Sequence, residues 1–267
     1  MPLRALSQSC VLITGAGAGV GAALAAAFAA RGARVACADL DLAAARAVAA
    51  QVGGIGIGLD VRDPAMWANA VGQTEAALGR LDVLVNNAGV LRSAWALDQT
   101  EADARAMLET NVLGAVFGVQ TVLPGMLAQG GGRIVTIGAL AAYVPTKGQA
   151  LYAASQHALR AWHLGVAAEY ADRPIRCTLV SAGAVETGML RAERGVEAAA
   201  SAFAAQAVSA REVAAATLWA LSRGQEEICV PARGAWRARI AGLFPKRGRG
   251  LIDKAFAAGR ARLAQER

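Results

Sequence analysis

The sequence predicts an α/β fold in which one parallel sheet is covered by helices on both faces. Two observations lead to this prediction. Short, almost uninterrupted apolar runs alternate with helical segments, and a glycine-rich turn follows the first apolar run. Strands that are apolar along their whole length are typical of parallel sheets buried on both sides. Right-handed crossovers between such strands give a doubly wound, seven-stranded Rossmann sheet.

Seven apolar runs are the expected strands, at residues 10–13, 34–38, 55–59, 82–85, 133–137, 175–180 and 227–230. Helices are expected between them, from the glycine turn to about Ala30 and then over 41–52, 64–78, 101–127, 151–170, 196–207 and 210–222. Asp63 opens one of these helices, and residues 209–212 form a capping box for another. No linker divides residues 1–231, so we expect one domain there, followed by a basic, partly helical extension over 232–267.

Positive charge is concentrated in this extension. Residues 232–267 contain ten Lys or Arg and two Asp or Glu, a net charge of +8, whereas residues 1–231 carry −1. Apolar residues at roughly helical spacing among the arginines favour helices packed on the body or on a second subunit. A peripheral element that binds an anionic lipid surface is the alternative. No recognition motif for nucleic acid accompanies the charge, so we expect no such partner.

The four cysteines each fall within an apolar run, which favours reduced thiols in the core. No CxxC pair or His/Cys spacing indicates a metal site, so none is expected. The uncharged stretch from Ser7 to Ala30 contains too many glycines for a membrane span or a signal sequence. We therefore expect a soluble, cytoplasmic protein.

The glycine turn lies within CVLITGAGAGVG at residues 10–21. A buried strand that runs through glycines into a helix is the arrangement that holds a dinucleotide pyrophosphate. Glycines let the backbone approach the phosphates, and the N–H groups at the helix start receive the anion. The expected cofactor-binding residues of the turn are Gly15, Gly17, Gly19, Val20 and Gly21.

Asp39 ends the second strand, eighteen positions after Gly21. A carboxylate there can accept hydrogen bonds from the adenosine ribose and repels a 2′-phosphate. Ala18 in the turn offers no cation for such a phosphate either. The alternative, in which Asp39 and Asp41 form a helix N-cap pair, is natural for Asp41 and less so for Asp39. We expect NAD rather than NADP as the cofactor.

A second motif, NNAG at residues 86–89, follows the fourth strand, although asparagines there could also be plain turn formers. With this motif the chain resembles the short-chain dehydrogenase/reductase family over residues 8–231. The family's TGxxxGxG pattern is matched by Thr14, Gly15, Gly19 and Gly21. The resemblance implies an NAD(P)-dependent oxidoreductase that acts on a hydroxyl or carbonyl group of a small molecule. The helices over 101–127 and 151–170 resemble those that the family pairs across a two-fold axis, so a homodimer or homotetramer is expected.

Further positions extend the resemblance to the rest of the cofactor site. The family's adenine-contacting acidic pair corresponds to Asp60-Val61, and its PGxVxT motif corresponds to residues 182–187, without the proline. The resemblance places Thr187 against the nicotinamide carboxamide. The additional cofactor-binding residues that it implies are Asp60, Val61, Asn87, Ala88, Gly89, Gly183, Val185 and Thr187.

The catalytic centre departs from the family's pattern. Tyr152 occupies the tyrosine position and Asn111 the asparagine position, but Gln156 replaces the lysine and Ala139 the serine. A lysine charge about 4 Å away would be worth about 4 kcal/mol at an effective dielectric near 20, so Tyr152 should be a weak acid or base without it. The missing serine removes a donor worth about 3 kcal/mol. The expected catalytic residues are Tyr152, Asn111 and Gln156.

Two functions remain open at this stage. The first is an oxidoreductase with an atypical active site, and the second is a catalytically silent NAD-binding relative that acts as a sensor, scaffold or oligomer partner. Tyr143 and Lys147 also spell YxxxK, but Pro145 between them disfavours a helix, so we interpret this match as a coincidence. We expect packing or interface roles for His157 and His163. Ser93, Thr146, Gln149 and Glu186 are expected to be surface residues of loops.

Overall fold

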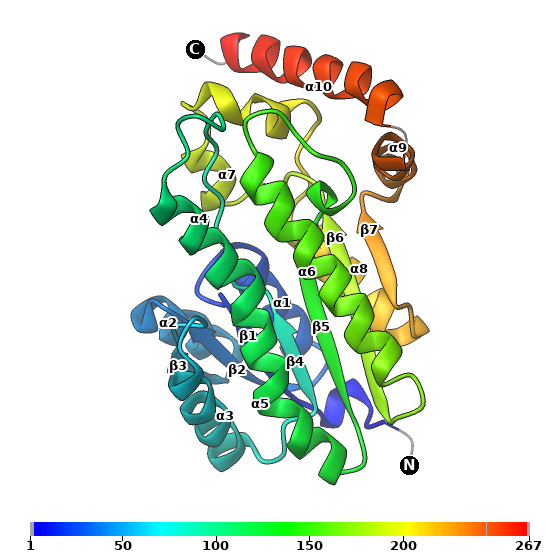
Figure 1. Cartoon of the computed structure of the whole chain (residues 1–267). Coiled ribbons are helices and arrows are strands. Elements are labelled where there is room, and N and C mark those ends of the chain that lie inside the picture. The colour runs from blue at the N-terminus through cyan, green and yellow to red at the C-terminus, as the bar shows by residue number, and fades with distance from the viewer. Residues whose placement is uncertain (1–2, 244, 266–267) are drawn as a thin grey trace.

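The computed structural model describes residues 3–243 and 245–265, and it contains a seven-stranded parallel sheet between two layers of helices (Figure 1). The strand order is β3-β2-β1-β4-β5-β6-β7. The strands are β1 (Cys10–Thr14), β2 (Arg34–Asp39), β3 (Ile55–Gly58), β4 (Val83–Asn86), β5 (Gly132–Ala139), β6 (Ile175–Ala182) and β7 (Glu227–Val230). This sheet confirms the predicted fold class.

The helices that cover the sheet are α1 (Gly19–Ala29), α2 (Leu42–Val52), α3 (Pro64–Leu78), α4 (Glu101–Leu108), α5 (Gly114–Ala128), α6 (Ala150–Glu169) and α8 (Ala210–Arg223). One face carries α3, α5 and α6, whose core residues include Trp67 and Met126. The other face carries α1, α2 and α8, with Phe28 and Leu218 in the core. Both faces of the sheet are thus buried, which explains the apolar strands.

Local side-chain contacts set the ends of several helices. The Asp63 side chain accepts from the N–H of Ala65 at the start of α3, with Pro64 at the first helical position. Ser209 and Glu212 form the predicted capping box of α8. Glycines in the left-handed conformation, Gly53 and Gly224, end α2 and α8. These elements therefore begin and end within one residue of the predicted bounds.

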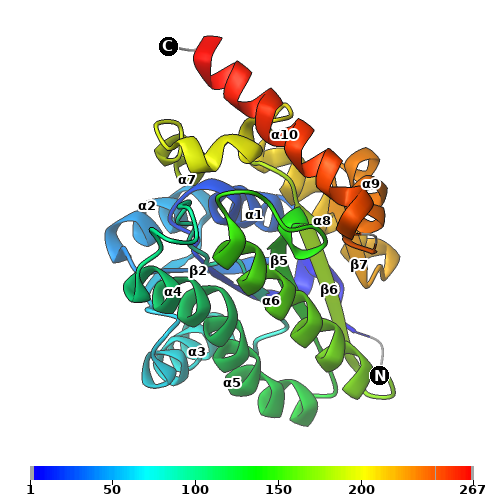
Figure 2. The same cartoon turned by 45° about the horizontal axis from the view of Figure 1, so that its top comes forward.

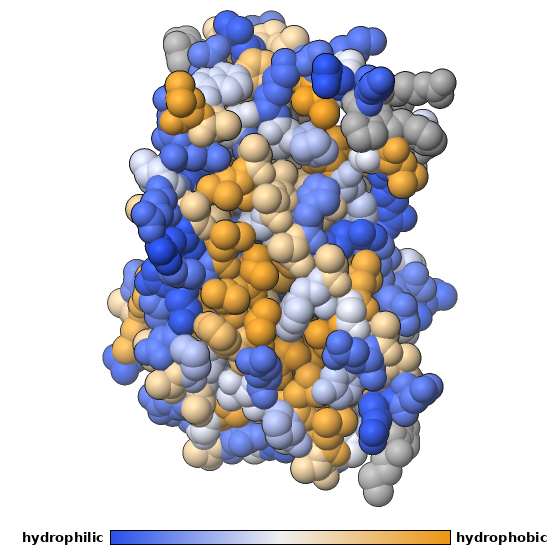
Figure 3. Space-filling view, in the orientation of Figure 1, coloured by the Kyte–Doolittle hydropathy of each residue, from blue (hydrophilic) through white to orange (hydrophobic). Residues whose placement is uncertain are grey.

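The helix predicted over 101–127 contains a π-helical turn, Glu109–Leu113, between α4 and α5. The extra residue of a π-turn changes the direction of the side chains that follow, and such turns are frequent at functional sites. Among the described residues, Glu101–Ala128 is the helix that is long and apolar enough to cross a membrane, and 44% of its apolar window is buried in the fold. Figure 3 shows hydrophobic residues gathered on the outer face, over α5 and α6.

The carboxyl-terminal residues fold back over the carboxyl ends of the strands (Figures 1 and 2). After β7 the chain forms α9 (Ala232–Leu243) and α10 (Pro245–Gln265). α10 packs on η4 (Glu197–Phe203), a 3₁₀ segment that follows the short helix α7 (Gly188–Ala192). For α10 the structure therefore confirms packing on the body, the first of the two alternatives for the tail.

Candidate active site

The glycine turn between β1 and α1 has a backbone that larger residues cannot adopt without strain. Gly15 and Gly19 have positive φ angles of 62° and 55°. A Cβ on Gly21 would collide with the carbonyl oxygen of Gly15, and a Cβ on Gly15 would lie 2.9 Å from Cα of Ala88. The glycine spacing thus serves a tight turn that packs directly against the loop after β4.

Asn87 ties these two segments together. Its Nδ2 donates to the carbonyl oxygens of Thr14 at 2.8 Å and Gly15 at 3.1 Å. In return, Oγ1 of Thr14 accepts from the N–H groups of Asn87 and Ala88, both at 3.0 Å. Thr14 and Asn87, from the two family motifs, therefore hold the turn and the β4 loop in one arrangement.

Asp39 and Asp41 have separate roles. Oδ2 of Asp39 accepts from the N–H of Gly17 at 2.8 Å, so the carboxylate holds the middle of the glycine turn. Asp41 caps α2 by accepting from the N–H groups of Ala43 and Ala44. No sequence pattern points to the Asp39–Gly17 hydrogen bond, because it joins the end of β2 to the glycine turn after β1.

Asp60 and Val61 lie in the segment between β3 and α3. Asp60 pairs with Arg62, with 2.6 Å between Oδ2 and Nη2, and its hydrogen bonds to Arg62 lower the pKa of the carboxyl group. The side chain of Val61 is buried, and a Cβ on Gly114 would lie 2.7 Å from its Cγ2. Val61 therefore packs its side chain against the start of α5.

Asn111 lies in the π-turn and joins three parts of the site. Its Oδ1 accepts from the N–H of Val90 at 2.8 Å, and its Nδ2 donates to the carbonyl oxygen of Val90 at 2.9 Å. The same Nδ2 donates to Oγ of Ser155 on α6 at 3.1 Å. Asn111 thus fixes the β4–α4 loop to the helix that carries Tyr152. Ser155 had no predicted role, and no sequence pattern identifies it.

Tyr152 lies in the first turn of α6 and is half-buried. Burial raises the pKa of its phenol to about 12. Gln156, one turn further on, is 5% exposed. Its Oε1 is buried without a hydrogen-bond partner among the described residues. A Cβ on Gly138 would lie 3.5 Å from this oxygen, so Gln156 lies over the end of β5.

The second YxxxK match does not form a catalytic pair. The Tyr143 hydroxyl, in the loop before α6, donates to Oε1 of Glu227 at 2.8 Å. Lys147 forms an ion pair with Asp253 of α10 instead. Glu227 also pairs with Arg160 and Arg239, so Tyr143 belongs to a partly exposed ionic cluster that reaches α9. Residues 143–147 are not helical, as Pro145 led us to expect, and the interpretation of this match as a coincidence stays a prediction.

The two histidines lie in different surroundings. His157 is exposed, and its Nδ1 lies 2.8 Å from the carbonyl oxygen of Ala153. His163 is buried, with Nδ1 2.9 Å from Oγ1 of Thr136. Burial lowers the pKa of His163 to about 4, so its ring is neutral at pH 7.

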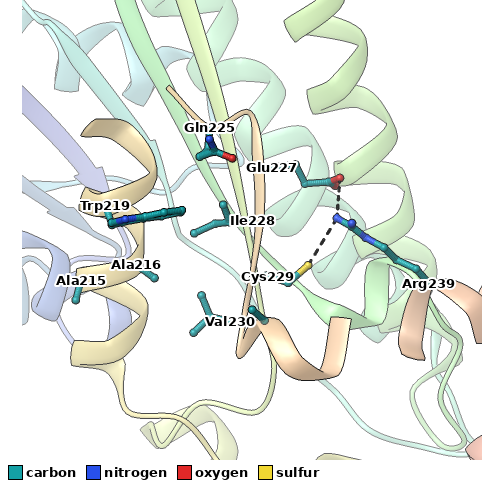
Figure 4. Close-up of a pocket in the computed structure, with 10 residues that line it drawn as sticks. Ala215, Ala216, Trp219, Gln225, Glu227, Ile228, Cys229, Val230 and Arg239 are labelled. Carbon is teal, nitrogen blue, oxygen red and sulfur yellow. Dashed lines mark hydrogen bonds and ion pairs between the residues drawn. The ribbon is translucent and has the colours of Figure 1, made fainter. Parts of the chain in front are cut away.

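Two pockets lie outside the predicted catalytic residues. One, of about 640 Å³, lies between α8, β7 and α9, where Trp219 and Ile228 face the cavity and Arg239 pairs with Glu227 (Figure 4). The other, of about 260 Å³, lies between α7, the segment after η4 and α10, and Thr187 and Glu186 line it. Within the described residues there is no group of three or more His, Cys, Asp or Glu side chains that could hold a metal.

Residues 9–197 match the short chain dehydrogenase family. The chain belongs to this family. FabG of Escherichia coli, a 3-oxoacyl-[acyl-carrier-protein] reductase, is 36% identical over 140 residues, which are 52% of this chain and 57% of that protein. LinX of Sphingobium indicum, a 2,5-dichloro-2,5-cyclohexadiene-1,4-diol dehydrogenase, is 33% identical over 187 residues, 68% of this chain and 75% of that protein. The match thus covers just over half the length of FabG.

Solved structures of short-chain dehydrogenases have the same fold. A Burkholderia phymatum protein in complex with NAD superposes with a TM-score of 0.83 at 23% identity, covering 90% of this chain and 95% of that one. A Brucella melitensis 3-ketoacyl-(acyl-carrier-protein) reductase complexed with NADH has a TM-score of 0.78 at 25% identity, covering 85% and 98%. The sequence resemblance to this family is therefore confirmed.

Proposed function

We propose that the chain is an NAD-dependent oxidoreductase that acts on a hydroxyl or carbonyl group with an atypical active site. The observation that carries the proposal is the glycine turn, which Thr14, Asn87 and Asp39 hold in one arrangement that depends on glycines. A protein with no dinucleotide ligand has no evident need for this arrangement. Relatives that are named as a reductase and a dehydrogenase support the same class of activity.

The residues present fit a dinucleotide. The glycine turn and the N-terminus of α1 offer N–H groups to a pyrophosphate. The Cγ2 of Thr187 would lie 3.1 Å from a Cβ on Gly19, so Thr187 is placed beside this turn. The buried Oε1 of Gln156 has no hydrogen-bond partner among the described residues, and a ribose hydroxyl would supply the donor. The remaining predicted contacts would come from Asp60, Val61, Ala88, Gly89, Gly183 and Val185.

Asp39 supports NAD over NADP. Its carboxylate ends β2, where a ribose hydroxyl can donate to it and a 2′-phosphate would be repelled. The N-cap of α1 is Ala18, which offers no positive charge to offset that repulsion. We therefore propose NAD as the cofactor.

When bound, the nicotinamide would supply a hydride to a carbonyl or accept one from an alcohol, and the chain would supply the proton in the first case and accept it in the second. Because burial raises the pKa of Tyr152 to about 12, its phenol is protonated at neutral pH. A protonated phenol can donate to the oxygen of a carbonyl substrate as that oxygen gains charge. Asn111 holds α6 against the β4–α4 loop and so keeps Tyr152 in place. The site is thus better suited to carbonyl reduction than to alcohol oxidation.

A catalytically silent, NAD-binding protein is the second candidate. Ala139 at the end of β5 offers no hydroxyl, and the uncharged Gln156 takes the place of the lysine. Titration of NADH by fluorescence, followed by a screen of aldehydes and ketones, separates the two candidates. An enzyme binds NADH and reduces some substrates slowly, and Tyr152→Phe abolishes the reduction while NADH still binds. Binding without any turnover would favour the silent protein.

We also propose that the chain forms a homodimer or homotetramer through α4, α5 and α6 and that it is cytoplasmic. Leu108 of α4 and Leu113 of the π-turn between α4 and α5 are 40% and 42% exposed, which favours a partner surface.

A further inference from the structure

The last helix, α10, is held on the body by side chains from three separate loops. Asp253 pairs with Lys147 of the β5–α6 loop. The ring of Phe256 lies 5.6 Å from that of Trp95 in the β4–α4 loop. Arg260 pairs with Glu197 of η4, with 3.5 Å between Nε and Oε1. These three segments all follow the carboxyl ends of strands, so α10 is anchored at the same end of the sheet as the candidate active site.

A close backbone contact fixes the position of α10 along η4. A Cβ on Gly259 would collide with the carbonyl oxygen of Ala200 and would lie 3.3 Å from the backbone nitrogen of Ala204. Gly259 therefore lets the helix pack directly on the η4 backbone. Gly250, on the same helix, has nothing within 4 Å of a Cβ. The contrast between the two glycines shows where α10 depends on close packing.

This docking places Arg262 at the pocket of about 260 Å³. Arg191 of α7 and Arg194, two residues beyond α7, line the same pocket. Among the described lining residues, Glu186 is the one acidic side chain. Three arginines from two distant parts of the chain thus line this pocket, with one carboxylate among the lining residues that the structure describes. Apolar walls from Leu190 and Phe203 complete it.

Guanidinium groups are suited to carboxylates and phosphates, which they bind through paired N–H donors. Residues 1–231 carry a net charge of −1, so the presence of Arg191 and Arg194 at this pocket does not reflect a generally basic body. Thr187 also lines the pocket, and it is the residue that the family resemblance places against the nicotinamide. A group bound in the pocket would therefore lie beside the expected cofactor.

We propose that this pocket binds the anionic group, a carboxylate or a phosphate, of a small molecule, and that α10 completes the pocket by supplying Arg262. This inference rests on the proposed function. Under that function, the substrates are alcohols and carbonyl compounds that carry a carboxylate or a phosphate. The basic extension is then a specificity element of the enzyme.

The test is calorimetric titration of the full-length protein with inorganic phosphate and with succinate, at a fixed ionic strength set by NaCl. We expect Arg262→Gln to weaken binding of at least one of them by about tenfold, because a charge-assisted pair is lost. Arg249→Gln is the matched control, since Arg249 is an exposed arginine of α10 that does not line the pocket. It should leave the affinity unchanged. Equal losses in the two variants would overturn the proposal by showing diffuse electrostatics.

A second pair of variants tests the part that α10 plays. Gly259→Val should displace the helix and weaken anion binding as much as Arg262→Gln does, whereas Gly250→Val should not. Full anion affinity in a folded Gly259→Val protein would contradict the role of α10. If Gly259→Val does not fold, the Arg262→Gln and Arg249→Gln pair decides.

Titration with NADH distinguishes this inference from other uses of the pocket. Arg262→Gln should bind NADH as the wild type does. A loss of NADH affinity as large as the loss of anion affinity would assign the arginines to the cofactor pyrophosphate and overturn the proposal. If anion binding depends on Arg262 but no acidic substrate is turned over, the proposed pocket is supported. The same result counts against the proposed oxidoreductase function and not against the pocket.

Discussion

Asp39 connects cofactor choice to the shape of the glycine turn. Its Oδ2 holds the N–H of Gly17, and the same carboxylate carries the charge that should reject a 2′-phosphate. A change that removes the side chain would therefore disturb the turn as well as the charge. The two effects can be separated with a residue that keeps an oxygen in place.

Asp39→Asn removes the charge and keeps an acceptor for the Gly17 N–H. We expect its affinity for NADPH to rise about tenfold, because repulsion of the 2′-phosphate is lost, while NADH affinity changes by less than about threefold. Fluorescence titration of both reduced cofactors measures this. Asp41→Asn is the control, since Asp41 caps α2 and Asn also caps helices well. Tighter binding of NADPH than NADH by the wild type would contradict the assignment.

Tyr152 should give the activity a distinctive pH dependence. Alcohol oxidation needs the phenolate as a base, and burial raises the pKa of this group to about 12. The oxidation rate should therefore rise by about tenfold per pH unit between about pH 7 and 10. Gln156→Lys should lower the pKa of Tyr152 by up to about three units, so that the oxidation rate reaches its plateau at a lower pH. Gln156→Met, which adds no charge, should leave the pH profile unchanged. A wild-type rate that is flat over this range would argue against Tyr152 as the base.

His163 should make the protein less stable in weak acid. Burial lowers its pKa from 6.5 to about 4 in the folded protein. Between these values the unfolded chain binds a proton that the folded protein excludes. The free energy of unfolding should therefore fall by up to about 3 kcal/mol as the pH drops through this window. Denaturant unfolding at several pH values measures this. The fall in the free energy of unfolding should be smaller for His163→Gln than for the wild type, and it should equal the wild-type fall for the exposed His157→Gln. Identical pH dependence in all three proteins would refute this.

At the scale of elements, apolar runs and capping residues predicted most of the fold. The sequence patterns placed α3 at 64–78 and β7 at 227–230, with the bounds that the structure shows. Strands β5 and β6 each extend two residues further at their carboxyl ends than predicted, because Gly138 pairs with Ser181 and Ala139 with Ala182. Glycine and alanine carry little strand preference, so pairing between strands decides their conformation.

The candidate site was less predictable than the strands. Its motifs identified Tyr152, Asn111 and the glycine turn, but the links between them depend on tertiary contacts. The π-turn that carries Asn111 has no signature in the sequence, and the Ser155 hydroxyl is recognisable only once Asn111 is seen to donate to it. The place of α10 over the loops likewise required the structure, because helical spacing predicts a helix but not where it packs.

The outer face of α4, α5 and α6 should form the contact between subunits. Leu113, at the end of the π-turn, is 42% exposed on this face. We expect light scattering to show a dimer or tetramer at micromolar concentration, and Leu113→Glu to shift it to smaller species. Leu40→Glu is the control, because Leu40 is 72% exposed before α2, away from this face. A wild-type monomer under these conditions would refute the proposed interface.

At the scale of the whole molecule, the charge separates into a nearly neutral body and a strongly basic extension. The structure brings the two together, since α10 crosses the carboxyl end of the sheet and pairs with Lys147 and Glu197 through Asp253 and Arg260. The division into residues 1–231 and 232–267 stays a prediction. The extension nevertheless lies over the loops that surround the candidate active site, where it can influence what reaches Tyr152 (Figure 2).

The central claim is that Tyr152 is the acid of an NAD-linked centre that lacks two of the family's groups. The most direct test is kcat for NADH-dependent carbonyl reduction by the wild type and by Ala139→Ser combined with Gln156→Lys, each with and without Tyr152→Phe. We predict that the double change raises kcat on the order of 10²-fold, because both groups stabilise charge that develops in the transition state. Tyr152→Phe should abolish activity in both backgrounds while NADH still binds. A wild-type rate that survives Tyr152→Phe, or a double variant that binds NADH and reduces nothing, would contradict the claim.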